Sequence, residues 1–254
     1  MSLLEHFREA RNRALLAAIG VLLCAIIGWN LYSPVIRLLA EPLERISLQE
    51  NRIAELNYGT VISAFDLQIR VAMYLGVFFS APWWIYQIWA YIAPALKKKE
   101  KRLALGFAAA AFPLMAAGAA FAWWVLPQAI SIMLSFVPEQ SASLMDARMY
   151  FTFCLRLISV FALAFLLPVV MVGINMLGLI SGKGYLKAWR WAIVLSVIFA
   201  AAASPMGDPW SLMLLTTPLI VLYFATCGIA VINDKRRAKK RATQQAALQA
   251  EYGV

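Results

Sequence analysis

The chain has 254 residues, of which 63% are hydrophobic and 14% are charged, and its mean hydropathy is +0.73. A soluble domain is usually about 45–50% apolar and roughly 25% charged, so this composition excludes an ordinary soluble protein and indicates a polytopic membrane protein. The net charge of +10 comes from 23 Lys and Arg residues against 13 Asp and Glu residues.

Cysteine and histidine content argues against a disulfide framework and a metal site. Cys24, Cys154 and Cys227 all lie inside apolar runs, where a cysteine behaves as a small buried hydrophobic residue. His6 is the only histidine, which is too few for a histidine-based metal site. We therefore expect neither a metal nor any other cofactor.

Six apolar segments predict an all-α membrane domain over residues 1–232, followed by a basic tail over residues 233–254. A helix needs about 20 apolar residues to cross roughly 30 Å of hydrocarbon. The strongly apolar part of the fifth segment reaches only about 20 Å, so the last two spans are predicted to be short, with their connection submerged or the membrane thinned around it. The predicted spans are residues 14–34, 68–95, 103–126, 152–180, 187–204 and 209–232.

The first segment follows an arginine-containing start, as a secretory signal peptide does. Its apolar run ends in "GWNLYSPV", which lacks the small-x-small pattern of a cleavage site. We expect an uncleaved first span.

Two long loops lie between the spans on the side opposite to the termini. In "SPVIRLLAEPLERISLQENRIAELNYGTV" apolar residues recur at helical intervals, with Pro34 and Pro42 expected to start short elements. "PQAISIMLSFVPEQ" has similar spacing. Both loops are predicted to form short amphipathic helices that cap the bundle.

Basic residues are distributed unequally between the two sides. Seventeen of the 23 Lys and Arg residues lie before the first span, in "KKKEKR", in "GKGYLKAWR" and in the tail segment "DKRRAKKR". This asymmetry predicts that both termini are cytoplasmic. The basic tail is interpreted as a topology signal that is attracted to anionic lipid, and no nucleic-acid role is expected.

Prolines within the spans indicate kinked helices. Four prolines lie within or at the ends of spans: Pro82, Pro113, Pro168 and Pro218. This is typical of kinked membrane helices and also fits a bundle bent into a concave wall.

Charged residues are absent from the middle of the spans, which argues against a proton-coupled transporter, an ion channel or an intramembrane enzyme.

Acidic residues on the cytoplasmic side need a separate explanation. In a helix over residues 3–15, Glu9 is expected to face solvent, opposite an apolar stripe into which Arg11 falls and from which it must snorkel or pair. Glu100 lies within "KKKEKR". Charge balancing is one interpretation, for example an i,i+4 pair between Glu9 and Arg13. The other is that the two carboxylates form a receptor for a cationic peptide.

Three segments resemble the TatC family of twin-arginine protein translocase subunits. "EHFREARNR" is similar to the family pattern H-L-x-E-L-R-x-R, and "SAPWWIYQIWAYIAPALKKKEKR" matches the family's second span and first cytoplasmic loop. "SPMGDPWSLMLLTTP" fits the last hairpin. The six spans, the topology and the capped loops also agree, so the resemblance covers almost the whole chain.

The resemblance implies the membrane receptor of a translocase that exports folded proteins, driven by the protonmotive force. Such a protein is not an enzyme, lies in the cell membrane, and assembles with itself and with single-span TatA- and TatB-like subunits. Its cargo carries a signal peptide with consecutive arginines. A small-molecule transporter of another family is the alternative, but the spans show no polar path for a substrate.

Individual positions take their expected roles from the resemblance. The signal-peptide site is expected to contain Glu9, Arg11, Tyr91, Glu100 and Arg102. A guanidinium binds a carboxylate through two parallel hydrogen bonds, which lysine cannot reproduce.

On the opposite side of the membrane, Pro42, Phe65 and Asp208 match positions of structural or functional importance. In "GDPW", Asp208 can also simply cap the last helix. The fourth span departs from the family: Leu166 stands where the family often has a glutamate, so we do not expect a mechanism that needs that carboxylate.

Overall fold

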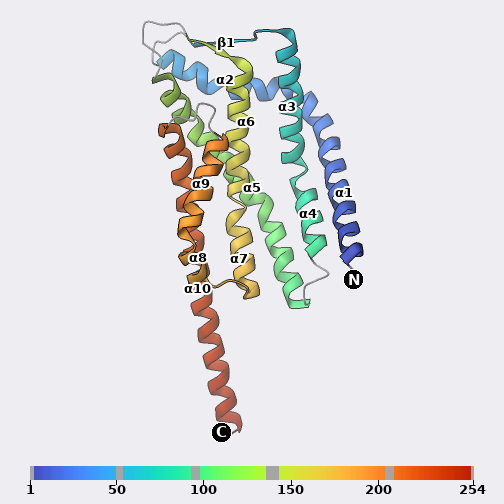
Figure 1. The fold of residues 1–254 in the computed structure, drawn as a ribbon, viewed down its shortest axis with the longest axis vertical. Coiled ribbons are helices and arrows are strands. Elements are labelled where there is room, and N and C mark those ends of the chain that lie inside the picture. Colours follow the sequence, from blue (N-terminus) through green and yellow to red (C-terminus); the bar gives the residue numbers. More distant parts are fainter. Residues whose placement is uncertain (1–2, 50–53, 93–97, 136–142, 204–208, 253–254) are drawn as a thin grey trace.

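The computed structural model describes residues 3–49, 54–92, 98–135, 143–203 and 209–252. Helices dominate these residues (Figure 1). In chain order the elements are α1 (Leu3–Asn30), α2 (Tyr32–Gln49), β1 (Ala54–Asn57), α3 (Val61–Phe79), α4 (Ala81–Ile92), α5 (Lys98–Ser135), β2 (Ser143–Asp146), α6 (Ala147–Ala164), α7 (Leu167–Leu177), α8 (Gly182–Lys187), α9 (Trp189–Ala203) and α10 (Pro209–Tyr252).

The predicted all-α membrane architecture is confirmed. Within the described residues, five helical stretches are long and apolar enough to cross a membrane, namely Glu5–Asn30, Ile62–Phe79, Leu105–Ile132, Ala147–Met176 and Leu212–Lys239. The fifth predicted span is the shorter apolar helix α9, whose 15 residues reach about 22 Å. Figure 1 shows that the end of α9 and the start of α10 lie well below the upper end of α6.

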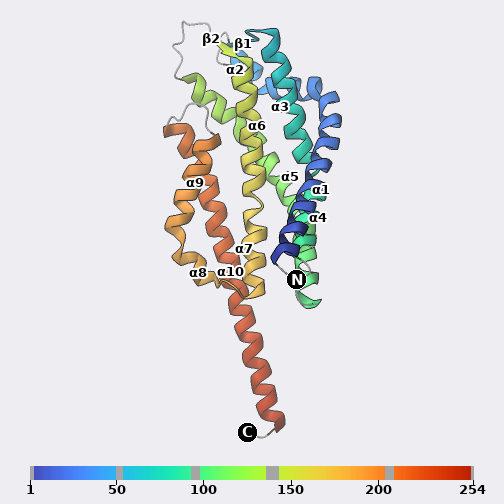
Figure 2. The same cartoon turned by 45° about the vertical axis from the view of Figure 1, so that its right-hand side comes forward.

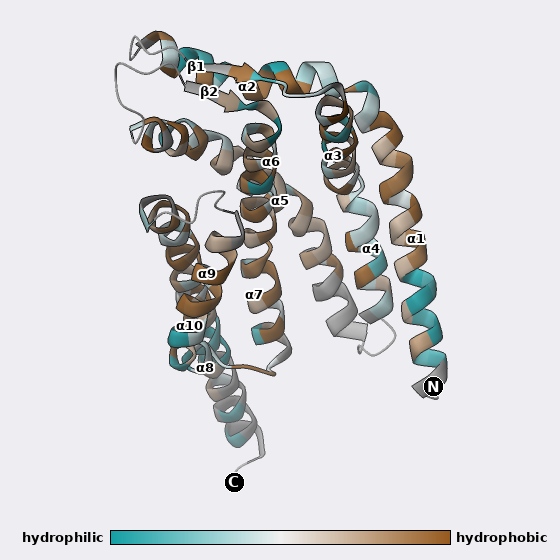
Figure 3. Ribbon diagram, turned by 45° about the horizontal axis from the view of Figure 1, so that its top comes forward, coloured by the Kyte–Doolittle hydropathy of each residue, from teal (hydrophilic) through white to brown (hydrophobic). Residues whose placement is uncertain are grey.

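The bundle has two distinct ends. Figures 1 and 2 show the start of α1, the end of α4, the start of α5 and helix α8 at one end, from which α10 continues outward; we call this the terminal end. The opposite end, the distal end, carries α2 and the starts of α3 and α6. Hydrophilic residues gather at the terminal end of α1 and around α8 and α10, whereas the middle of the helices is hydrophobic (Figure 3).

The second span is divided at Ser80 into α3 and α4. Pro82 has no N–H and its ring clashes with the preceding turn, so a straight helix through this position is disfavoured. At this break the carbonyl oxygen of Val77 accepts from the Trp84 indole nitrogen at 3.0 Å and from the Ser80 hydroxyl at 3.3 Å. A similar break separates α6 from α7, where Pro168 lies in the first turn of α7.

A cap covers the distal end, but not quite as the sequence analysis predicts. Pro42 does not start a new element, because α2 is one continuous helix that includes it. The loop segment after residue 126 is helical but continuous with α5 as far as Ser135. The strands β1 and β2, which the sequence does not predict, pair in parallel, with Ala54 opposite Ser143 and Asn57 opposite Asp146.

The main hydrophobic core lies where α2, α3, α5 and α6 meet. Leu43, Leu67, Leu126 and Phe151 are each 2% exposed or less. The buried Tyr150 donates its hydroxyl to the carbonyl oxygen of Leu39 at 2.8 Å, which fixes α6 to α2 without leaving a polar atom unpaired. This core gives the distal half a fixed arrangement of helices.

A network of polar contacts, which we call the α7–α10 clamp, holds the other end of the bundle. The Asp234 carboxylate accepts from the Asn175 side-chain amide at 2.9 Å and from the Gly182 backbone at 2.7 Å. Asn233 donates to the Asn175 side-chain oxygen at 2.8 Å, and Arg237 donates to the Asn175 carbonyl at 3.0 Å. These bonds join the end of α7, the start of α8 and the middle of α10, which continues unbroken into the basic tail.

Candidate functional site

The terminal end of α1 carries an ion pair along one face of the helix. Both the Nε and NH2 atoms of Arg13 donate to the Oε1 atom of Glu9, at 3.0 and 2.9 Å. The two side chains are 27% and 22% exposed, so the pair is half-buried and still open to solvent. This is the i,i+4 pair that the charge-balancing interpretation of the sequence names.

Helix α4 contacts the same face of α1 at two levels. The Nε2 atom of His6 lies 2.7 Å from the Tyr91 hydroxyl oxygen, and the two rings stack with centroids 4.8 Å apart and an interplanar angle of 26°. Seven residues further along α1, Arg13 approaches the buried Gln87 side-chain oxygen at 3.5 Å. Since Gln87 and Tyr91 are one turn apart, Glu9 lies between two contacts to α4.

Contacts deeper in the bundle set this alignment of α1. The Trp83 indole nitrogen, one residue after Pro82, donates to the Leu16 carbonyl at 2.9 Å. Gly76 allows α3 to approach α1 closely, since a Cβ there would lie 2.8 Å from the Val21 carbonyl oxygen. The break at Ser80 therefore has a role in the site, because it turns α4 so that its aromatic side chains reach α1.

One expectation for α1 is wrong. The helical wheel directs Glu9 into solvent, but the side of α1 that carries Glu9 is packed against α4 and the Glu9 side chain is only 22% exposed. Arg11 is exposed, as are Phe7 and Leu15 of the apolar stripe in which the wheel places it, and its NH2 atom lies 3.5 Å from the Asn12 side-chain oxygen. A helical wheel of one helix carries no information about which side its neighbour will cover.

The other expected signal-peptide residues lie on α4 and α5. Tyr91 is half-buried at the end of α4. Glu100 and Arg102 are the third and fifth residues of α5, and their side chains lie outside the described part of the structure. In Figures 1 and 2 the start of α5 lies beside the end of α4 and the start of α1. The backbone therefore brings the three segments together at the terminal end.

The distal positions are separate from this site. Pro42 is buried within α2. Phe65 on α3 is 56% exposed and packs edge-to-face on Trp29 of α1, with ring centroids 5.9 Å apart. Asp208 lies outside the described residues. Leu166, at the break between α6 and α7, is half-buried and packs with the apolar cluster around Ala81 and Met115.

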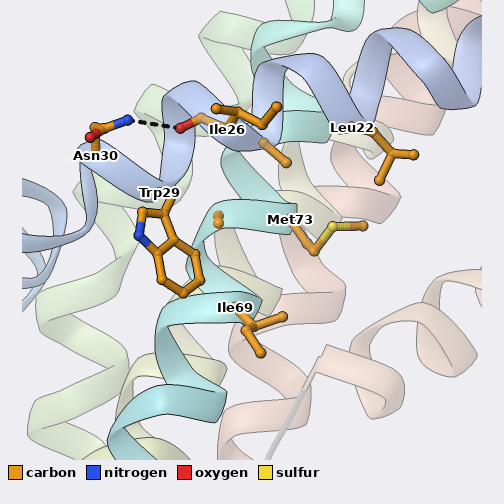
Figure 4. A pocket seen from close by; sticks show the side chains of 8 residues that line it. Leu22, Ile26, Trp29, Asn30, Ile69 and Met73 are labelled. Atoms are coloured by element: carbon orange, nitrogen blue, oxygen red, sulfur yellow. Dashed lines mark hydrogen bonds between the residues drawn. The ribbon is translucent and has the colours of Figure 1, made fainter.

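A hollow of about 330 Å³ between α1 and α3 is a poor candidate for recognition of a charged ligand (Figure 4). Its lining is apolar except for Asn30, whose side-chain amide already donates to the Ile26 carbonyl at 3.0 Å. Among the described residues there is also no group of three or more His, Cys, Asp or Glu that could hold a metal ion. The chemistry at the terminal end is therefore that of carboxylate, guanidinium and aromatic groups.

Sequence reasoning misses His6 and Gln87 as parts of the site, because it considers His6 only as a metal ligand. The available signal is spacing: His6, Glu9 and Arg13 lie three and four residues apart, so they share one face of a helix. Gln87 is a polar residue in a strongly apolar helix, which indicates a specific partner.

Known proteins support one family for the whole chain. The family model described as "Sec-independent protein translocase protein (TatC)" matches residues 5–218. A relative of that name from Xylanimonas cellulosilytica is 40% identical over 247 residues, which cover 97% of this chain and 89% of the relative. One from Rothia mucilaginosa is 43% identical over 243 residues, covering 95% and 83%.

Solved structures agree with the sequence matches. Two structures of the "Twin Arginine Translocase Receptor- TatC", one of them in DDM, superpose with TM-scores of 0.80 and 0.79. They are 26% and 27% identical to this chain, and each match covers 89% of this chain and at least 98% of the solved chain. Sequence and fold together show that this chain belongs to the TatC family of Sec-independent protein translocase proteins.

Proposed function

We propose that this multi-pass membrane protein is the receptor of a twin-arginine translocase, and that it binds signal peptides at the terminal end of the bundle. Glu9 and Glu100 bind the two guanidinium groups of the signal. Tyr91 provides an aromatic surface beside them, and Arg11 and Arg102 set the local charge. The observation that carries the proposal is the position of Glu9, half-exposed between the His6–Tyr91 and Arg13–Gln87 contacts.

The Glu9–Arg13 pair already shows the chemistry proposed for binding a signal-peptide arginine. A guanidinium already donates two N–H groups to the Glu9 carboxylate. An arginine of the signal peptide can exchange with Arg13 or share the carboxylate with it, and no new side-chain conformation of Glu9 is required. Charge-assisted bonds of this kind contribute roughly 1.5–3 kcal/mol each, so two acids suffice to distinguish paired arginines from scattered positive charge.

The surroundings favour arginine over general basic sequence. The segment "KKKEKR" places five cations around Glu100. These cations repel a peptide whose charges are not paired directly with a carboxylate, which is a form of selection against wrong partners. Because lysine lacks the planar fork of arginine, a Lys-Lys signal loses bonds at both acids.

Orientation and assembly follow from the same proposal. Both termini lie in the cytoplasm and residues 233–254 form a cytoplasmic extension, as the distribution of Lys and Arg predicts. The six spans lie in the cell membrane and recruit single-span TatA- and TatB-like subunits for export, with more than one copy of this chain in the complex. We assign no catalytic step to it. Pro42, Phe65 and Asp208 act at the distal end, where they maintain the cap.

The experiment is co-purification of a folded cargo carrying a twin-arginine signal with Glu9→Ala and Glu100→Ala variants in membranes. Each variant is expected to insert normally and to lose cargo retention and export. The control is Glu44→Ala, which removes an exposed acid from α2 at the distal end. Normal cargo retention by both variants would show that these carboxylates do not form the receptor.

A further inference from the structure

Three arginines from two helices gather at the distal end, outside the site proposed above. Asp66 on α3 accepts through its Oδ2 atom from the Nε atom of Arg70 at 2.7 Å, and the Nε atom of Arg148 forms an ion pair with the same oxygen at 2.9 Å. The arginines are 37% and 48% exposed. Both contacts use the Nε atom, so the terminal NH1 and NH2 groups of each guanidinium are not engaged by these bonds.

Arg156 is the third cation, and it has no comparable partner. It is exposed, and no hydrogen bond or ion pair joins it to any other residue that the structure describes. Arg70 and Arg156 are each the tenth residue of helices α3 and α6, which both start at the distal end. Both Cα atoms thus lie about 14 Å along the helix from its start.

That depth determines what can neutralise Arg156. A cation just inside the hydrocarbon boundary extends its side chain toward the headgroup region, where the phosphates of the lipid lie. Among the residues whose side chains the structure describes, the carboxylates beside the three arginines do not balance their charge. Asp66 pairs with Arg70 and Arg148, and Asp146 lines the hollow with all three arginines but also caps α6, where it accepts from the Met149 backbone at 2.8 Å. One positive charge remains.

The three arginines border a common hollow of about 450 Å³. Its lining combines donors with apolar groups and consists of Arg70, Asp146, Arg148, Met149, Thr152, Phe153 and Arg156. Below it, on the way to the middle of the span, exposed apolar side chains continue along both helices: Met73 and Val77 on α3, and Leu163 on α6. A phosphate with attached acyl chains matches this order of charged and apolar groups.

We propose that this hollow binds the phosphate of an anionic phospholipid in the leaflet at the distal end. Arg156 is the main phosphate ligand, and the free amino groups of Arg70 and Arg148 complete it. A phospholipid with a single net negative charge, such as phosphatidylglycerol, neutralises the remaining charge. Because its phosphate also touches α3 and α6 at once, the lipid reinforces the connection that Asp66 makes between these helices.

The test is a lipid-binding assay with the purified protein in detergent. Fluorescence anisotropy of acyl-labelled phosphatidylglycerol measures the affinity, and unlabelled ligands are added as competitors. Arg156→Gln is expected to weaken binding about tenfold, because it removes the main charge-assisted contact. Arg156→Lys, which keeps the charge, should retain most of the affinity. The control is Arg37→Gln on α2, another exposed cation at the distal end that does not line the hollow. Its affinity should stay within about twofold.

Competing ligands identify the source of the phosphate. Unlabelled phosphatidylglycerol should displace the probe, phosphatidylcholine should need roughly fivefold more, and inorganic phosphate should not displace it at millimolar concentration. Equal effects of Arg156→Gln and Arg37→Gln, equal competition by the two lipids, or displacement by inorganic phosphate would each overturn the proposal. Because the readout is lipid binding, the result is independent of whether Glu9 recognises a signal peptide.

Discussion

The hydroxyl oxygen of Tyr91 lies 2.7 Å from the Nε2 atom of His6, so the end of α4 is bonded directly to the start of α1. The two residues are 85 positions apart, and their rings also stack. This contact fixes the distance between the two helices beside Glu9. It therefore gives the proposed signal-peptide site a defined shape before any peptide binds.

Tyr91→Phe separates the hydrogen bond from the ring contact. A neutral hydrogen bond contributes about 0.5–1.5 kcal/mol, so we expect this variant to bind a twin-arginine signal peptide about twofold to tenfold more weakly. The measurement is fluorescence anisotropy with a labelled peptide and the detergent-purified protein. Tyr86→Phe is the control, because Tyr86 is exposed on the same helix and does not contact α1 through its hydroxyl in the described structure. Equal losses in both variants would contradict a specific role for the His6–Tyr91 bond.

Arg13→Gln removes the guanidinium group that forms an ion pair with the Glu9 carboxylate. Because a signal-peptide arginine then no longer competes with an internal one, we expect the peptide to bind about twofold to fivefold more tightly at physiological salt. The control Arg8→Gln removes one positive charge from an exposed position of the same helix and leaves the Glu9–Arg13 pair intact. If the two variants change the affinity equally, the effect is one of net charge and Arg13 does not compete for Glu9.

Close packing of α1 on α3 gives a prediction about stability. In Gly76→Ala the new Cβ would lie 2.8 Å from the Val21 carbonyl oxygen, so the helices must separate. We expect a loss of about 1–3 kcal/mol, measured as a lower melting temperature in detergent. Gly106→Ala on α5 is the matched control, since a Cβ added there would have no atom of another residue within 4 Å and alanine favours the helix. A stable Gly76→Ala protein would contradict the close approach of α1 and α3.

The α7–α10 clamp gives another stability prediction. Asp234→Ala removes the acceptor of the Gly182 N–H and one of the two acceptors of the Asn175 amide, which keeps its bond to the Ile180 carbonyl, so we expect a loss of about 2–3 kcal/mol. Lys235→Ala, at the next and exposed position, should change the melting temperature little. Thermal unfolding followed by size-exclusion chromatography distinguishes the two. If Asp234→Ala has the same melting temperature as the wild type, the α7–α10 clamp contributes little to stability.

Much of this fold is predictable from composition and periodicity, because lipid imposes strict limits on length and polarity. The short α9 follows from counting apolar residues, and the family resemblance identifies the receptor. The β1–β2 pairing is not predictable, since it joins two loops through backbone bonds that leave little trace in side-chain pattern. The prediction for Pro42 is wrong for a related reason: a proline can start a helix or lie within one, and packing decides between them.

The site is predictable in its charges but not in its geometry. The pairing of Glu9 with Arg13 follows from spacing within one helix. The burial of that pair does not, because it depends on how α4 turns at Ser80 and on the contacts of Gln87 and Trp83 with α1. The expectation that Glu9 faces solvent is wrong for the same reason. Contacts between helices distant in sequence are set by the whole bundle, and a single helix does not encode them.

In the proposed site, the Glu9 carboxylate distinguishes an arginine of the signal peptide from a lysine. The most direct measurement is the affinity of paired peptides, one with Arg-Arg and one with Lys-Lys in the signal, for the wild type and for Glu9→Gln. We expect the wild type to prefer Arg-Arg by about tenfold or more, and Glu9→Gln to lose most of that preference while its affinity for Lys-Lys changes little. An unchanged Arg-Arg preference in Glu9→Gln, or an equal loss for both peptides, would contradict the claim.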